Sequence, residues 1–197
     1  MNKTTRPLQI NEIRQIMDCV VNGFEYEENG KIKKFRPNKQ LEIVILIQMN
    51  VGLRINDIIK RLFVKSFKNG KVEIIEEKTN KLQYRDVNPM LINLIQDYAL
   101  ENNLKKDDKL IKISARAIQK QLKIVCDYLG LENVGTHSFR KFYATTQYEK
   151  TKDIEIVKEL LNHSSVATTQ KYIKIKRELV DKASKEYFIN PYEQEEH

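Results

Sequence analysis

The sequence predicts a mainly helical α+β domain that contains a small three-stranded antiparallel sheet. Apolar residues recur at helical spacing over most of the 197 residues. Between residues 63 and 89 the pattern changes to short segments separated by turns, and Asn69-Gly70 is a strong signal for a tight hairpin. A hydrophobic content of 41% is typical of a globular protein, so we expect a single domain over residues 1–197.

The N-terminal part is predicted to begin with an amphipathic helix over residues 8–22. Residues 22–39 are polar and rich in lysine and arginine, so we expect a basic loop there. A helix that is apolar on nearly every side follows over residues 41–49, which indicates a position in the middle of the core. Gly52 predicts the end of this helix.

The rest of the chain is divided by turn and capping residues. Asn56 is expected to cap a helix over residues 57–62. Three strands follow, predicted at residues 64–67, 72–77 and 83–88, with a second turn at Asn80. Further helices are predicted at residues 89–102, 114–130, 136–150 and 153–161, with Ser114, Thr136 and Asp153 as caps. A brief helix from Ser164 or Ser165 runs through the Tyr172 region, and a last helix at 178–187 precedes an acidic tail, residues 188–197.

The net charge of +8 indicates a polyanionic partner. Nucleic acid is the first candidate and an anionic membrane surface the second, while a solvated basic surface without a specific partner stays open. Cys19 and Cys126 fit no metal-ligand spacing and are flanked by apolar residues, so we expect both to pack in a core. With no signal peptide and no apolar run long enough to span a bilayer, we expect a cytoplasmic protein.

Three short segments concentrate the chemically active side chains. Arg54 and Asp57 lie three residues apart at a helix start, and His137 and Arg140 lie three apart on a later helix, so each pair shares a helix face. His163 is followed after nine residues by Tyr172. Two arginines, two histidines and a lysine, Lys78, would suit a phosphodiester in its pentacoordinate state, whose oxygens gain charge. The set therefore supplies a nucleophile, charge stabilisation and proton donors without a metal ion.

Five motifs resemble those of the tyrosine recombinases, the integrase family of lambda integrase and Cre, in the same order and at similar spacing. They are Gly-Leu-Arg-Ile at residues 52–55, Lys78-Thr79, His137-x-x-Arg140, Leu161-x-His163 and Tyr172. The resemblance runs from about Pro7 to the last predicted helix, and it implies the fold of that family's catalytic domain. Asn162 departs from the pattern, because glycine is usual there, and Phe139 stands where leucine is common.

The resemblance implies a role for each matched residue. Tyr172 would be the nucleophile that forms a 3′-phosphotyrosine, and Arg54 and Arg140 would hold the phosphate, with Asp57 supporting Arg54. Lys78 would protonate the leaving 5′ oxygen, although Lys81 in the same hairpin is an alternative. His137 would act as acid and base, and His163 would bond to the phosphate. Lys171, Lys174 and Lys81 are expected to contact the DNA backbone, and no metal, cofactor or ATP is expected.

The predicted function is that of a phage or mobile-element integrase or recombinase acting on double-stranded DNA, encoded by a bacterium or phage. Few residues precede the first helix, so we expect the family's N-terminal core-binding domain to be absent. A homotetramer on DNA is expected for a full-length protein and a monomer for an isolated domain. Two alternatives stay open: relaxation of DNA only, as in a type IB topoisomerase, or a DNA-binding regulator without catalysis.

Overall fold

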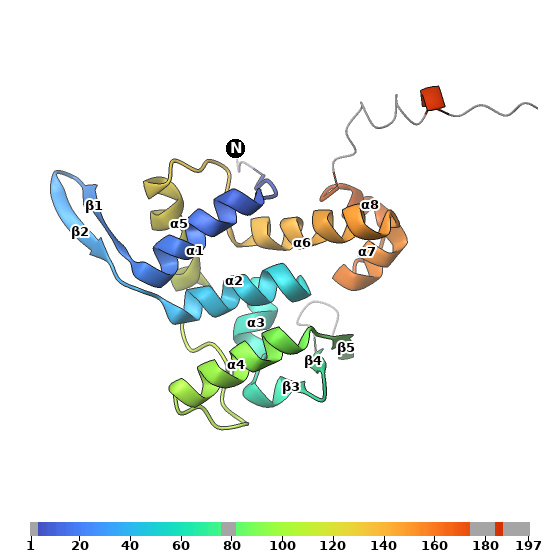
Figure 1. Cartoon of the computed structure of the whole chain (residues 1–197), viewed down its shortest axis with the longest axis horizontal. Coiled ribbons are helices and arrows are strands. Elements are labelled where there is room, and N and C mark those ends of the chain that lie inside the picture. The colour runs from blue at the N-terminus through green and yellow to red at the C-terminus, as the bar shows by residue number, and fades with distance from the viewer. Residues whose placement is uncertain (1–3, 76–81, 174–183, 187–197) are drawn as a thin grey trace, which may run out of the picture.

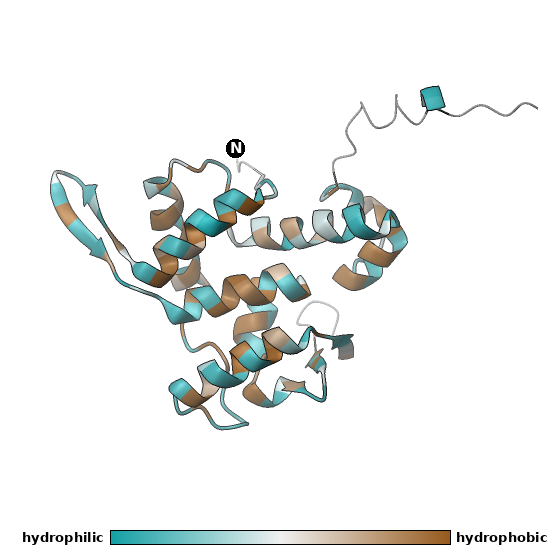
Figure 2. Ribbon diagram, in the orientation of Figure 1, coloured by the Kyte–Doolittle hydropathy of each residue, from teal (hydrophilic) through white to brown (hydrophobic). Residues whose placement is uncertain are grey.

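Helix α2 (Lys39–Val51) forms the centre of the computed structural model, which describes residues 4–75, 82–173 and 184–186 (Figure 1). Its side chains are buried on most of its circumference, and helices α1, α3, α4, α5 and α6 all pack against it. Figure 2 shows brown, apolar residues along this helix. Asn38 caps its first turn by accepting a hydrogen bond from the Leu41 N–H, and Gly52 ends it in the left-handed conformation. The predicted central helix is confirmed.

Over residues 4–173, as far as the structure describes them, the other α-helices pack on α2 or on its neighbours. Their bounds are α1 (Ile10–Asn22), α3 (Ile55–Arg61), α4 (Pro89–Glu101), α5 (Ala115–Tyr128), α6 (Thr136–Thr151), α7 (Ile154–Leu161) and α8 (Val166–Gln170). The predicted caps Ser114, Asp153 and Ser165 each accept a backbone hydrogen bond at the start of α5, α7 and α8. The predicted helix at residues 178–187 and the acidic tail lie almost entirely outside the described residues.

Two predicted caps were wrong. Helix α3 begins at Ile55, so Asn56 lies within its first turn and the extended Arg54 is the cap residue. Helix α6 begins at Thr136 and its cap residue is Gly135, whose N–H donates to the Ser138 hydroxyl. In both cases the chain turns into the helix one or two residues earlier than the polar side chain suggested. Helix α8 also ends at Gln170, so Tyr172 lies in the turn beyond it.

The predicted basic loop at residues 22–39 was also wrong, because this segment forms a β-hairpin. Strands β1 (Phe24–Glu28) and β2 (Lys31–Phe35) pair antiparallel and project from the body of the molecule (Figure 1). Asn29 and Gly30 both have positive φ angles, which is the requirement of the tightest hairpin turns. At the base, the Phe24 ring stacks on Phe35 and on Tyr128 of α5.

The predicted three-stranded antiparallel sheet is confirmed, with strand limits that differ from those expected. Its order is β3-β4-β5, formed by β3 (Phe67–Lys68), β4 (Lys71–Ile75) and β5 (Leu82–Asp86). Residues Val64–Ser66, predicted as strand, form a single 3-10 turn. The predicted turn at Asn80 lies outside the described residues.

The buried residues form two clusters. The larger one surrounds α2 and contains both cysteines, as predicted. The smaller one joins α6, α7 and the turn after α8 through Tyr143, Ala144, Val157, Leu161 and Ile173. Tyr148 and Tyr172 both pack against this smaller cluster. Within the part of the chain that the structure describes, no helix is both long and apolar enough to cross a membrane.

Candidate active site

Arg54 and Asp57 are brought together by the sharp turn between α2 and α3. Gly52 reverses the chain with a φ angle of 70°, and α3 starts three residues later. The Arg54 guanidinium lies 3.8 Å from a carboxylate oxygen of Asp57, whose side chain is 2% exposed. The first turn of a helix favours a negative charge. Asp57 is therefore suited to orient Arg54, which keeps access to solvent at 21% exposure.

Arg140 of α6 is completely buried and joins three segments of the chain. Its guanidinium donates to the carbonyl of Gly52 at the end of α2 and, at 2.7 Å, to the carbonyl of Leu161 at the end of α7. The same nitrogen that bonds to Leu161 lies 3.2 Å from Nε2 of His163. These contacts fix both the position of the guanidinium and the relative placement of α2, α6 and α7.

His163 has a defined hydrogen-bonding arrangement. Because a guanidinium can only donate, Nε2 of His163 is the acceptor from Arg140. Nδ1 then carries the proton, 3.0 Å from the hydroxyl of the buried Thr169. Asn162, the residue before it, ends α7 in the left-handed conformation with a φ angle of 50°. This is the conformation that glycine adopts most easily and that asparagine also tolerates, which accounts for the departure from the family's pattern.

Tyr172 lies between His163 and a lysine that the sequence did not single out. Its ring centroid is 5.1 Å from that of His163, with the ring planes tilted by 57°. The ammonium group of Lys141 lies 5.6 Å from the same ring centroid, within the range of a cation–π interaction. The ring is partly buried against the smaller core, so its orientation is restricted by packing.

His137 is placed in the first turn of α6, with its side chain exposed to solvent. Partial desolvation lowers the pKa of His137, and the positive charges of Arg140, Lys141 and Arg54 lower it further. The neutral form is therefore favoured near neutral pH, in which one ring nitrogen can accept a proton.

The structure links Arg140, His163 and Tyr172 by direct contacts. Arg54, which pairs with Asp57, lies two residues beyond Gly52, whose carbonyl bonds to Arg140. His137 lies one turn before Arg140 on α6. Lys171, predicted to contact DNA, is exposed in the turn beside Tyr172. Lys78, Lys81 and Lys174 lie outside the described residues, so their predicted roles stay predictions. Two guanidinium groups and two imidazoles beside a phenol can stabilise the charge of a phosphodiester under attack.

Three residues with a part in this arrangement were missed from the sequence. Thr169 bonds to Nδ1 of His163, Lys141 lies over the Tyr172 ring, and Arg85 of β5 donates to the carbonyl of Val51 at 2.6 Å. Lys141 alone had a usable signal, because it lies four residues after His137 on one helix face. Over the described ranges, no three His, Cys, Asp or Glu side chains are grouped so as to hold a metal ion.

Comparison with known proteins shows the family of this chain. The sequence pattern of the Phage integrase family matches residues 7–178. The probable integrase/recombinase YoeC of Bacillus subtilis (strain 168) is 31% identical over 162 residues, which are 76% of this chain and 86% of that protein. The chain spans about half the length of several other curated relatives that it matches.

Solved structures share the fold. The XerH site-specific recombinase, in a post-cleavage complex with palindromic difH substrate, superposes with a TM-score of 0.71 at 21% identity, covering 94% of this chain and 53% of that one. The catalytic domain of bacteriophage HP1 integrase gives a TM-score of 0.66 at 17% identity. It is matched over 92% of this chain and 95% of its own length.

Proposed function

The chain belongs to the phage integrase family, and we propose on this basis that it is a site-specific DNA recombinase that works through a covalent bond to Tyr172. Its substrate is double-stranded DNA. The net charge of +8 supports a polyanionic substrate. On DNA we expect a homotetramer, so that two duplexes can exchange strands.

The proposed reaction is a reversible transesterification. The phenolic oxygen of Tyr172 attacks a backbone phosphorus, and the bond from phosphorus to the 5′ oxygen breaks. The DNA then carries a 3′-phosphotyrosine on one side and a free 5′-hydroxyl on the other. A 5′-hydroxyl of a second strand reverses the step and releases Tyr172. The number of phosphate ester bonds is conserved, so the exchange needs no ATP.

Each residue around Tyr172 contributes to one part of this step. Arg54 and Arg140 bind the non-bridging oxygens, whose negative charge grows during the attack. His137, neutral at physiological pH because its pKa is lowered, accepts the phenolic proton. His163 orients Arg140 through Nε2 and limits the position of the Tyr172 ring. Lys78 is assigned by the family resemblance as the proton donor to the leaving oxygen.

The observation that carries the proposal is the contact series from Arg140 through His163 to Tyr172. A buried guanidinium bonds to a histidine at 3.2 Å, and the centroid of that ring lies 5.1 Å from the centroid of the tyrosine ring. These contacts hold a cation beside the phenol, which suits a phosphate that Tyr172 attacks.

A trapping experiment tests this function without knowledge of the target site. Purified protein is incubated with nicked, fragmented DNA from the genome that encodes it, and complexes that survive detergent are collected and sequenced. We expect a covalent adduct whose DNA ends cluster at one site. Tyr172→Phe should abolish the adduct. Tyr148→Phe is the matched control, since Tyr148 packs against the same small core, and it should leave the adduct unchanged.

Two results would overturn the proposal. One is the absence of any detergent-stable adduct with folded wild-type protein. The other is an adduct that persists in Tyr172→Phe, which would assign the chemistry to a different nucleophile.

A further inference from the structure

We propose that Lys141 is a positioning residue for Tyr172 and that the N-terminal strap, defined here as residues 4–9, holds Lys141 in place. The proposal rests on the proposed function, because it takes Tyr172 as the nucleophile. The strap would thus affect the orientation of the Tyr172 ring, although the two are more than 160 positions apart in sequence.

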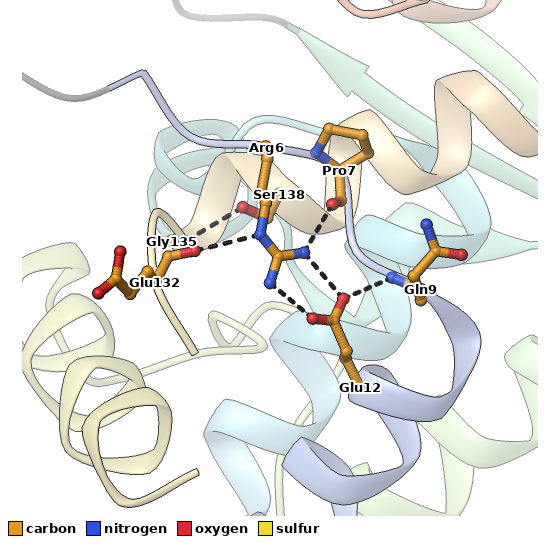
Figure 3. Close-up of polar contacts among 7 residues, drawn as sticks. All are labelled: Arg6, Pro7, Gln9, Glu12, Glu132, Gly135 and Ser138. Carbon is orange, nitrogen blue, oxygen red and sulfur yellow. Dashed lines mark hydrogen bonds and ion pairs between the residues drawn. The ribbon is translucent and has the colours of Figure 1, made fainter. Parts of the chain in front are cut away.

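The strap is held by several contacts to α1 and to the segment that precedes α6. Arg6 forms a two-pronged ion pair with Glu12 of α1, at 2.6 and 2.9 Å, and its Nε donates to the Glu132 carbonyl at 3.1 Å (Figure 3). The Arg6 N–H also donates to the Asn133 carbonyl at 2.9 Å. Glu12 in turn accepts from the Gln9 N–H at 2.8 Å, and Leu8 is buried in the main core. The strap therefore connects α1 to the segment that precedes α6.

Thr5, the residue before Arg6, is connected to the candidate active site by the side chain of Lys141. The Lys141 ammonium donates a hydrogen bond to the carbonyl of Thr5. The same ammonium lies 5.6 Å from the centroid of the Tyr172 ring. The Thr5 side chain also approaches Gly135, where an added Cβ would lie only 3.3 Å from its methyl carbon. Lys141 is therefore held between the strap and the nucleophile.

This arrangement limits where the ammonium can go. A lysine side chain has four rotatable bonds, so a cation over a ring is short-lived unless a second contact holds it. The Thr5 carbonyl supplies that contact, and the Arg6–Glu12 ion pair fixes the carbonyl. Displacing the strap would release Lys141 and widen the range of orientations of the Tyr172 ring. Attack on phosphorus requires an aligned oxygen, so the covalent step would slow.

The first test reads the ring position without DNA. Protein labelled with 13C on its tyrosine rings gives signals by NMR, and the one lost in Tyr172→Phe belongs to Tyr172. Lys141→Met should move this signal toward its position in denatured protein, and Lys141→Arg should keep it near the wild-type position. Lys150→Met, at an exposed lysine in the last turn of the same helix, is the control and should change nothing. An unmoved Tyr172 signal in Lys141→Met would overturn the proposal.

The second test separates positioning from DNA binding. With saturating DNA, Lys141→Met should slow adduct formation about fivefold to tenfold, the size of effect expected from one cation–π contact. The Kd for DNA and the melting temperature should stay at wild-type values, and Lys141→Arg should restore the rate. If Lys141 binds a phosphate instead, the Kd will rise and its salt dependence will weaken. That outcome, with normal ring signals, would contradict the proposal.

The third test addresses the strap itself. Arg6→Gln removes the ion pair with Glu12 and should slow adduct formation in the wild-type background, but not further when Lys141 is already methionine. Arg14→Gln, at an exposed arginine of the same helix as Glu12, is the control. Equal effects of Arg6→Gln in both backgrounds would contradict a route through Lys141.

The two proposals fail separately. If folded wild-type protein forms no adduct, the proposed function fails, while the NMR comparison still decides whether Lys141 positions the ring. If the adduct forms and depends on Tyr172 but Lys141→Met changes neither rate nor ring signal, only the positioning proposal fails.

Discussion

Arg140 joins three segments of the chain and also contacts a candidate catalytic residue, His163. Its guanidinium is completely buried, yet it satisfies the carbonyls of Gly52 and Leu161 at the ends of two helices. Buried carbonyls are costly when they lack a donor, so the arginine stabilises the fold. The same group lies against His163, which faces Tyr172. Under the proposed function, Arg140 therefore serves both stability and catalysis.

Replacing Arg140 by lysine should reveal this coupling. An ammonium cannot reproduce the planar fork that serves two carbonyls and His163, so we expect a loss of about 3 kcal/mol of unfolding free energy, measured by urea denaturation. Adduct formation should fall below detection at temperatures where the variant is still folded. Arg116→Lys, at an exposed position of α5, should stay within about 0.5 kcal/mol of wild type. Equal stability of the two variants would contradict the account.

His137 predicts the pH dependence of the covalent step. Folding lowers its pKa from the ordinary value of 6.5, chiefly by desolvation and then through the charges of Arg140, Lys141 and Arg54. The neutral base therefore persists as pH falls to 6.5, and the rate of adduct formation should decline only below that value. His137→Gln should react more slowly and lack this decline. A decline of the same shape in both proteins would assign it to another group.

The same shift has a consequence for stability. The unfolded chain binds a proton at His137 more readily than the folded chain does. Linkage then makes the folded state lose stability as pH falls below about 6.5, with no contribution above it. The difference in melting temperature between wild type and His137→Gln should therefore change over this acidic range alone.

At the scale of elements, the turn between α2 and α3 places two site residues at once. Gly52 has a φ angle of 70°, and a Cβ there would lie 2.5 Å from Cδ1 of Tyr143. Because α6 approaches Gly52 so closely, Arg140, which lies one turn before Tyr143 on α6, can donate to the Gly52 carbonyl. Arg54 follows two residues later. The glycine therefore serves both the backbone conformation and the packing of α6.

Gly52→Ala should be more harmful than the same change at another left-handed glycine. Gly30, at the tip of the β1–β2 hairpin, has a φ angle of 71° but nothing within 4 Å of its Cβ position. Gly30→Ala should cost about 1 kcal/mol from backbone strain alone. Gly52→Ala adds a clash in a packed core, for a total of about 3 kcal/mol, and should slow adduct formation. Thermal denaturation of the two variants gives the comparison, and equal losses would show that packing at Gly52 is unimportant.

Sequence patterns predicted those elements whose apolar faces are buried. The helices around α2 and the sheet from β3 to β5 have such faces, and their presence and order were confirmed, although several ends differ from those predicted. The β1–β2 hairpin was missed because its strands are mostly exposed and carry glutamates on β1 and lysines on β2. The alternation of aromatic and acidic residues in β1, and the turn signal Asn29-Gly30, which repeats that of Asn69-Gly70, both favour strands. The basic composition of residues 22–39 suggested a loop, whereas the Asn29-Gly30 turn indicates two paired strands.

The candidate site was predictable to the same extent. Motif spacing identified Arg54, His137, Arg140, His163 and Tyr172 as a set, and the structure shows direct contacts among Arg140, His163 and Tyr172. Thr169 and Lys141 were not identified, because their contacts to His163 and Tyr172 depend on how α6, α7 and α8 pack. The contacts of the strap could not be predicted from sequence either, because Arg6 bonds to the carbonyls of residues 132 and 133 only in the folded chain.

At the scale of the whole molecule, the net charge of +8 favours a polyanion, and the number of phosphate contacts sets how DNA binding depends on salt. Each phosphate contact releases counterions, so affinity should fall steeply with salt concentration. Lys171→Gln, beside Tyr172, should reduce the slope of log K against log salt by about 1. Lys158→Gln is the control, because Lys158 already pairs with Glu155 at 2.8 Å and Glu159 at 3.3 Å. Equal slopes for Lys171→Gln and wild type would exclude a phosphate contact at Lys171.

Mass spectrometry of the trapped adduct can locate the proposed covalent bond between Tyr172 and DNA. The adduct is digested with nuclease and protease, and the modified peptide is fragmented to locate the added mass. We expect a nucleotide joined through its 3′ phosphate to Tyr172, and no modified peptide from Tyr172→Phe. A nucleotide attached to any other residue, or a 5′ phosphate linkage, would contradict the account.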